Sequence, residues 1–305
     1  MTRREGLLPR LRRGDVVLGD GAWGPMLMAR GLPAGEAPER VNLDRPDWLT
    51  EIAALYLAAG AEVVTTNTFG ASPLRLLAHG LSSRTEEICR AAVDAVRKAV
   101  GGAAWISGSI GPTGRLLAPL GDTEPAEVAH AFARQARALS DAGVDLLCVE
   151  TMTSLDEALL AVRAARAAAP GLPVVATLTF DATPRGFFTV MGDPVPRAAA
   201  VLAEAGADVV GANCGEGIET MVALAAEWRR STALPIAVRP NAGLPRVVAG
   251  VLVHPDSPDR FAALAPALLD AGVTLLGGCC GTTPEHVRAL RSPIDARRKG
   301  PAPPV

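Results

Sequence analysis

Eight strand-like apolar runs, separated by helix-like segments, recur along this chain of 305 residues. Each run is short, rich in β-branched residues and followed by a turn rich in Gly, Asn or Thr. The runs are continuously apolar rather than alternating, which indicates a sheet covered on both faces. The predicted strands are Val16–Asp20, Glu62–Thr66, Ala104–Gly108, Asp145–Val149, Pro173–Thr179, Ala207–Gly211, Leu234–Arg239 and Val273–Leu276.

Segments rich in Ala, Leu and Arg with helical spacing lie between these runs. The length alone would also suit two domains, but the regular alternation predicts a single-domain (β/α)8 TIM barrel with its site at the carboxyl ends of the strands. We expect the barrel over residues 1–291 and a flexible tail over residues 292–305. The predicted helices include Asp47–Ala59, Thr85–Val100, Glu124–Ala142, Ser154–Ala168, Pro196–Ala205, Ile218–Arg230 and Ser257–Ala271.

Charge and hydropathy limit the classes of partner. The net charge of −2 provides no basic surface for nucleic acid or anionic lipid. The first residues do not form a signal peptide, and no apolar run is long enough to span a membrane. The odd number of cysteines, five, with two of them adjacent, favours reduced thiols over a disulfide framework. We therefore expect a cytoplasmic protein that acts on a small molecule, with no nucleic-acid or membrane partner.

Three cysteines follow predicted strands, Cys214 after one and the adjacent Cys279 and Cys280 after another. In a parallel barrel these strand ends meet at one face, so the three thiols match the ligand set of a zinc site with one coordination position open. Cys89, in a predicted helix, and Cys148, within a strand, are better interpreted as small buried hydrophobes. The pattern therefore predicts a Zn²⁺ site at the catalytic face.

Other residues, nearly all of them polar, lie at the ends of the predicted strands and could line a pocket for a polar substrate. An alternative remains open for each of them, because Gly and Asn also serve turns. These residues are Asp20, Gly21, Thr66, Asn67, Ser107, Ser109, Glu150, Thr151, Thr179, Asp181, Asn213 and Asn241.

Six segments, spread from about Gly14 to Leu290, together resemble the homocysteine S-methyltransferase family. The pair formed by Gly-Gly-Cys-Cys-Gly and an upstream Asn-Cys is highly specific. The resemblance implies a zinc-dependent (β/α)8 barrel that methylates homocysteine to methionine. The segments are Asp20–Gly24, Thr65–Gly70, Gly108–Gly114, Gly211–Cys214, Pro240–Gly243 and Gly277–His286.

The resemblance also implies roles for particular residues. It assigns zinc to Cys214, Cys279 and Cys280, with Asn241 as an oxygen ligand when substrate is absent. It assigns the amino group of homocysteine to Glu150, for which the alternative is a carboxylate that caps the helix near Ser154. It places Asp20 and Gly21 at the amino-acid end of the substrate. It places Thr66, Asn67 and Ser109 in the wall of the pocket.

The implied chemistry begins at the substrate thiol. A thiol with a pKa near 8.5 is mostly protonated at neutral pH, whereas the thiolate is the nucleophile. Zinc deprotonates a thiol that coordinates it. The sulfur of homocysteine would then displace the methyl group from its donor in line.

The methyl donor is left open by the sequence. Within the family, the motifs are most similar to the homocysteine-binding module of cobalamin-dependent methionine synthase. Because the sequence contains one barrel, methylcobalamin is then expected to come from a separate protein. The alternatives are S-methylmethionine or betaine as the donor, another acceptor such as selenohomocysteine, or a zinc- or thiol-binding barrel without turnover that serves a partner.

Overall fold

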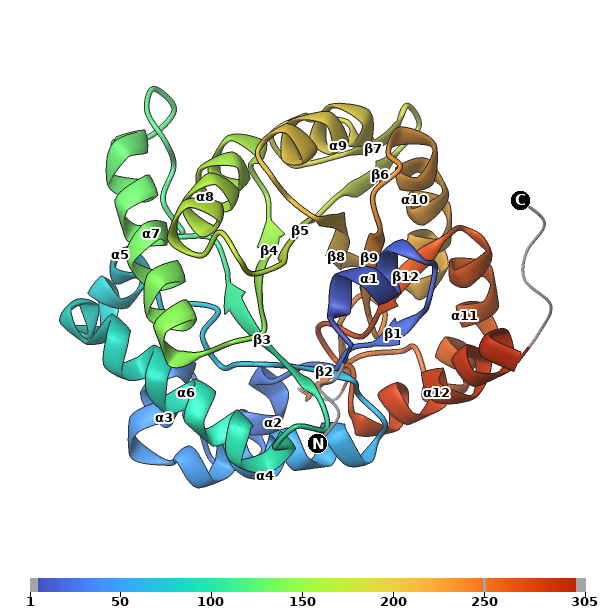
Figure 1. The fold of residues 1–305 in the computed structure, drawn as a ribbon, viewed down its shortest axis with the longest axis horizontal. Helices are drawn as coiled ribbons and strands as arrows, with labels where there is room; N and C mark the ends of the chain where they lie inside the picture. The colour runs from blue at the N-terminus through green and yellow to red at the C-terminus, as the bar shows by residue number, and fades with distance from the viewer. Residues whose placement is uncertain (1–4, 249–250, 300–305) are drawn as a thin grey trace.

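The computed structural model describes residues 5–248 and 251–299. Its main sheet has eight parallel strands in the order β1-β12-β9-β8-β5-β4-β3-β2, and a bridge between Gly19 and Val63 joins the two ends of that order. The predicted single-domain (β/α)8 barrel is confirmed, and Figure 1 shows the helices surrounding the strands. The strands are β1 (Val17–Leu18), β2 (Val63–Thr65), β3 (Trp105–Ile110), β4 (Leu146–Met152), β5 (Val174–Leu178), β8 (Val209–Gly217), β9 (Ile236–Asn241) and β12 (Val273–Leu276).

All eight predicted strands are present, because each run is buried on both faces. Their carboxyl ends differ from the prediction. β4 continues to Met152, so Glu150 lies within the strand. β8 continues to Gly217 with an irregular register after Asn213, so Cys214 lies within the end of this strand and not beyond it.

The long helices also agree with the predicted pattern within one or two residues. The N-cap of α8 illustrates why, since the Ser154 side chain accepts a hydrogen bond from the Glu157 backbone N–H. These helices are α4 (Pro46–Ala58), α6 (Thr85–Val100), α7 (Pro125–Ala142), α8 (Leu155–Ala168), α9 (Val195–Glu204), α10 (Ile218–Ser231) and α11 (Pro258–Asp270).

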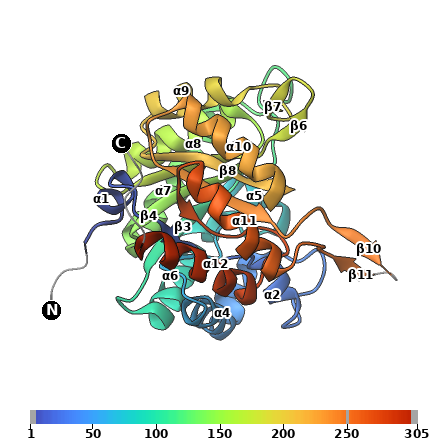
Figure 2. The ribbon, with the colours of Figure 1, turned by 90° about the vertical axis from the view of Figure 1, so that its right-hand side faces the viewer.

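Several short elements have no counterpart in the predicted pattern. Two antiparallel hairpins follow barrel strands, and the β10–β11 hairpin extends away from the barrel in Figure 2. No described helix is long and apolar enough to cross a membrane. The short elements include α1 (Leu7–Arg12), α2 (Gly24–Met28), α3 (Val41–Asp44), α5 (Pro73–Leu76), β6 (Asp181–Thr183), β7 (Gly186–Phe188), β10 (Arg246–Val248) and β11 (Val251–Val253).

The C-terminal segment differs from the predicted flexible tail over residues 292–305. Helix α12 (Pro284–Lys299) continues through Pro293 to Lys299, and residues 300–305 lie outside the described part of the chain. The helix persists because Ile294 is fully buried, and because Arg298 bonds to the Glu62 carboxylate at 2.7 Å. Packing against the barrel therefore outweighs the effect of the internal proline.

The amino-terminal end of the barrel is closed by α1. Leu7 and Leu11 of this helix are buried against an interior cluster that includes Val17, Trp105 and Leu146. This cluster fills the barrel below the site. The barrel is thus a packed scaffold at one end and carries its cavity at the other.

Glu62, at the start of β2, joins the same end of the barrel to its outer helices. Its carboxylate accepts hydrogen bonds from Arg10 at 3.0 Å, Arg291 at 3.0 Å and Arg298 at 2.7 Å. Burial would raise the pKa of Glu62, but the bonds from Arg291 and Arg298 outweigh it and lower this pKa to about 2. The carboxylate is therefore charged at any physiological pH.

Candidate active site and metal centre

Three cysteine thiols converge at the carboxyl end of the barrel. The Sγ atoms of Cys214, Cys279 and Cys280 all lie within 4.8 Å of one another, and those of Cys214 and Cys280 are 3.9 Å apart. A tetrahedral zinc ion with Zn–S bonds of about 2.3 Å needs sulfurs about 3.8 Å apart. The spacing therefore suits one zinc ion. Cys89 and Cys148 are buried outside this cluster, as predicted.

The backbone at the cluster is strained. In the described ranges, Thr151 and Cys214 are the non-glycine residues with positive φ, at 59° and 62°. Such conformations are unfavourable for residues with a side chain, and they persist only where the surroundings hold them. Thr151 lies at the end of β4 and Cys214 at the end of β8, with β5 between these strands. Asn213, the residue before Cys214, holds Thr151 through its side chain.

The fully buried Asn213 uses both polar atoms of its amide. Its Oδ1 accepts from the Thr151 backbone N–H at 2.8 Å and from the Thr177 hydroxyl at 2.7 Å. Its Nδ2 donates to the Thr151 hydroxyl at 2.7 Å and to the Cys279 Sγ at 3.7 Å. Asn213 therefore links β4 and β5 to the sulfur cluster.

The three thiols influence one another's ionisation. Hydrogen bonds from Cys279 and Cys280 lower the pKa of Cys214, and the Gly215 backbone and Asn241 add to this effect. The pKa values of Cys279 and Cys280 are raised, first of all by their hydrogen bonds with Cys214. The cluster on its own thus favours one thiolate, and a bound divalent cation would be needed to stabilise three.

Asn241 ends β9 beside the cluster. Its Nδ2 donates to the Gly215 carbonyl at 2.8 Å, whereas its buried Oδ1 has no hydrogen-bond partner. Buried polar atoms are rarely left unpaired, so an unpaired oxygen next to three thiols suits a cation at this place. The role of Asn241 as a fourth ligand stays a prediction.

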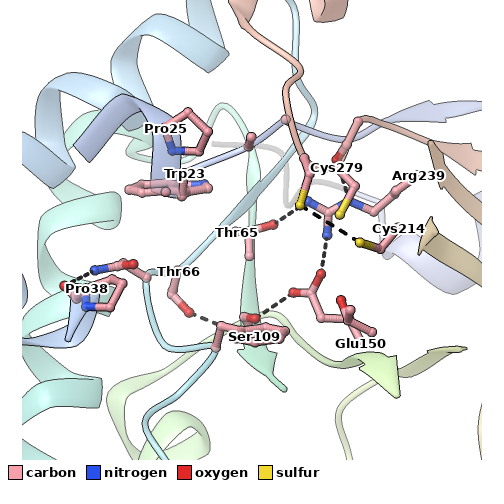
Figure 3. Close-up of a pocket in the computed structure, with 18 of the residues that line it drawn as sticks. Trp23, Pro25, Pro38, Thr65, Thr66, Ser109, Glu150, Cys214, Arg239 and Cys279 are labelled. Atoms are coloured by element: carbon pink, nitrogen blue, oxygen red, sulfur yellow. Dashed lines mark hydrogen bonds and ion pairs between the residues drawn. The ribbon is translucent and has the colours of Figure 1, made fainter. Parts of the chain in front are cut away.

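A cavity of about 280 Å³ opens beside the sulfurs. Its lining residues include the apolar or aromatic Trp23, Pro25 and Phe69. The three cysteines, Glu150 and Arg239 line it too, and Figure 3 shows the labelled ones, Cys214, Cys279, Arg239 and Glu150, across from Trp23 and Pro25. Nucleophilic, acidic and basic groups thus share one small cavity.

Glu150 lies on this cavity and accepts two side-chain hydrogen bonds. The Ser109 hydroxyl donates to its Oε1 at 2.5 Å, and Arg239 Nη1 donates to its Oε2 at 3.1 Å. Helix α8 is capped by Ser154 instead. The geometry therefore favours a pocket role for Glu150 over the alternative of a helix cap.

Asp20 lies behind the cavity wall, which Thr65 and Arg239 form at this point. Only 1% of Asp20 is exposed. Its Oδ1 accepts from the Thr65 hydroxyl at 2.8 Å and Arg239 Nη2 at 3.0 Å, and its Oδ2 from the Thr65 backbone N–H at 2.8 Å and Trp23 Nε1 at 2.9 Å. Gly21, the next residue, does line the cavity.

Two further predicted residues, Thr66 and Asn67, line the cavity and already make hydrogen bonds within the protein. The Thr66 hydroxyl bonds to that of Thr68 at 2.7 Å. The Asn67 amide donates to Asn42 Oδ1 at 2.7 Å and to the Pro38 carbonyl at 2.8 Å. Both side chains shape the wall, and a direct contact with substrate stays a prediction for each.

Arg239 is the main site residue that sequence reasoning missed. It ends the apolar run of a predicted buried strand, and a charge in such a place was a usable signal. Asn213 was recognised only as a polar residue at a strand end. Its bonds to Thr151 and Cys279 depend on strands that are neither adjacent in the sheet nor close in sequence.

A (β/α)8 barrel with three convergent thiols beside a charged pocket defines a candidate thiol-dependent metalloenzyme. The homocysteine S-methyltransferase family model matches residues 17–294, and the chain belongs to this family. The resemblance seen in the sequence is therefore confirmed.

Known proteins of similar sequence include methyltransferases with different donors. The methionine synthase of Mycobacterium tuberculosis is 33% identical over 92% of this chain, which corresponds to 24% of that protein. Betaine–homocysteine S-methyltransferase 1 of Danio rerio is 31% identical over 97% of this chain and 77% of that protein. The chain thus spans about a quarter of the length of the methionine synthases that it matches.

A solved structure supports the same relationship. The homocysteine methyltransferase MmuM from Escherichia coli, in its metallated form, superposes with a TM-score of 0.76 and 27% sequence identity. The match covers 91% of this chain and 96% of that one. This structural match therefore supports both the barrel fold and the family found from the sequence.

Proposed function

We propose that this chain is a zinc-dependent methyltransferase that converts homocysteine to methionine. The observation that carries the proposal is the position of three sulfurs, spaced for tetrahedral zinc, on the same cavity as Glu150. The unpaired Oδ1 of Asn241 and the family match support it. Zinc held by Cys214, Cys279 and Cys280 would lower the pKa of a fourth, substrate thiol and so supply the nucleophile.

The protein's own residues would bind and orient the substrate. Glu150, held by Ser109, offers a carboxylate to the substrate ammonium group. Trp23, Pro25 and Phe69, which line the cavity, would limit water around the substrate and so strengthen electrostatic contacts there. Asn213 fixes Cys279 through its amide and so maintains the spacing of the sulfurs.

For the donor, we propose methylcobalamin, which the similarity to methionine synthases supports. A small cationic donor such as betaine or S-methylmethionine is the second candidate. Trp23 and Phe69 on the cavity favour it, because aromatic faces attract quaternary ammonium and sulfonium groups. Similarity to enzymes whose names state those donors also favours it.

A cytoplasmic location is supported by the unpaired thiols.

A donor panel tests the function. Purified, reduced protein loaded with zinc would be assayed for methionine with homocysteine and, separately, methylcobalamin, S-methylmethionine, betaine and S-adenosylmethionine. We expect turnover with one donor and its loss on treatment with a chelator. A protein that binds no zinc would contradict the proposal. Zinc and homocysteine binding without turnover on any donor would favour a binding barrel that serves a partner.

A further inference from the structure

Arg239 ends β9 with a guanidinium group buried in the site. Its Nη1 donates to Glu150 Oε2 at 3.1 Å, its Nη2 to Asp20 Oδ1 at 3.0 Å, and its Nε to the Gly278 carbonyl at 3.2 Å. The side chain is 11% exposed and lines the cavity. One cation is therefore fixed between two carboxylates, and Figure 3 shows it beside Glu150 and the sulfurs of Cys214 and Cys279.

The two carboxylates differ in what they can still bind. A carboxylate has about four acceptor positions, and Asp20 receives four hydrogen bonds from the protein. Glu150 receives two and lies on the cavity. Asp20 is thus an anchor for Arg239, whereas Glu150 retains capacity for a ligand.

The wall of the cavity consequently presents an ion pair. Glu150 and Arg239 are adjacent and both line the space next to the thiols. A ligand that carries one positive and one negative group can bind to such a pair. Its ammonium group would contact the Glu150 carboxylate, and its own carboxylate would contact the Arg239 guanidinium. Arg239 Nη2 also donates to the Thr65 hydroxyl at 3.4 Å, so one of its five N–H donors is left, on Nη1, and this group can donate to a ligand carboxylate.

We propose that Arg239 is a specificity-determining residue that selects thiols bearing a complete amino-acid end, by receiving their carboxylate while Glu150 receives their ammonium group. The inference rests on the proposed function, whose zinc site places the substrate sulfur in the same cavity. A thiol with only one of the two charged groups would leave one member of the ion pair unmatched, and we expect it to bind more weakly.

The test compares three thiols by isothermal titration calorimetry with zinc-loaded protein. They are homocysteine, 3-aminopropane-1-thiol, which lacks the carboxylate, and 4-sulfanylbutanoate, which lacks the ammonium group. We expect the wild-type protein to prefer homocysteine over 3-aminopropane-1-thiol by about tenfold or more, the effect of one charge-assisted hydrogen bond. In Arg239→Met this ratio should fall towards one, with the affinity for 3-aminopropane-1-thiol retained.

Two further variants keep the test decisive. Arg239→Lys retains a charge for Asp20 but loses the fork, so it should fold and give an intermediate ratio. Arg166→Met removes an arginine that bonds to Gly206 far from the cavity, and it should leave the ratio unchanged. Thermal unfolding followed by circular dichroism would establish that each variant is folded.

The outcomes separate this inference from the proposed function. Equal losses of affinity for homocysteine and 3-aminopropane-1-thiol in the folded Arg239 variants would overturn the inference alone, because Arg239 would then only maintain the pocket. If the zinc-loaded wild-type protein bound none of the three thiols, the proposed function would be overturned, and the inference with it.

Discussion

Asn213 donates a hydrogen bond to the sulfur of Cys279 at 3.7 Å, and the same side chain holds the strained backbone of Thr151. Hydrogen bonds from groups behind metal ligands orient those ligands and tune their basicity. A single buried amide therefore connects the shape of the β4 end to the electronic state of one cysteine.

We expect Asn213→Asp to weaken metal binding by about 10- to 100-fold, because an acceptor would replace the donor that faces Cys279. Competition with a chromophoric chelator would measure the affinity, and the sulfur-to-cobalt absorption of Co²⁺-loaded protein would report on the thiolates. Thr179→Val is the matched control, since it removes a bond to the Asn213 carbonyl at 3.1 Å without touching sulfur. Identical cobalt spectra for Asn213→Asp and wild type would exclude this role.

Cys279→Ser should lose stoichiometric zinc and all turnover while the barrel stays folded, because this residue lies beyond β12 and outside the apolar core. Metal analysis and circular dichroism would measure the two properties. Cys89→Ala, within α6, should keep its zinc. Unfolding of Cys279→Ser at room temperature would instead indicate a structural metal.

Glu150→Gln should raise the Michaelis constant for homocysteine by about 10- to 100-fold, since it removes a charged partner of the substrate ammonium group. Zinc content should not change. Glu157→Gln provides the same substitution at another buried carboxylate, which bonds to Thr113 at 2.6 Å away from the cavity, and should affect stability only. An unchanged Michaelis constant in Glu150→Gln would remove this residue from substrate binding.

Glu62 should make the fold sensitive to acid. Its pKa is lowered from 4.5 to about 2 in the folded protein, so its stabilising contribution is complete above pH 4.5 and is lost as the pH falls towards 2. After allowance for solvent screening we expect about 1–2 kcal/mol. Urea unfolding of wild type and Glu62→Gln should therefore differ at neutral pH and converge in acid. A difference that does not depend on pH would contradict the assignment.

The sequence was sufficient for the barrel because continuous apolar runs report burial on both faces directly. It was also sufficient to bring the three cysteines together, since parallel strands end at one face. It was insufficient where the structure depends on contacts between distant residues. Arg239 and Asp20 are 219 positions apart, so the place of this arginine in a buried strand was a local signal, but its carboxylate partner was not. Likewise, the segment from residue 292, predicted as a flexible tail, is helical to Lys299, and the buried Ile294 belongs to this helix.

The joint between β1 and β2 has a consequence for dynamics. β1 is two residues long, and beyond the Gly19–Val63 bridge it is tied to β2 by the bond from the Thr65 amide to the Asp20 carboxylate at 2.8 Å. That carboxylate also anchors Arg239. Any local opening of the barrel at this joint would thus free the guanidinium from one of its two carboxylates and loosen the substrate end of the cavity. The rate at which the Thr65 amide exchanges with deuterium is therefore a direct measure of how often the pocket loses its shape.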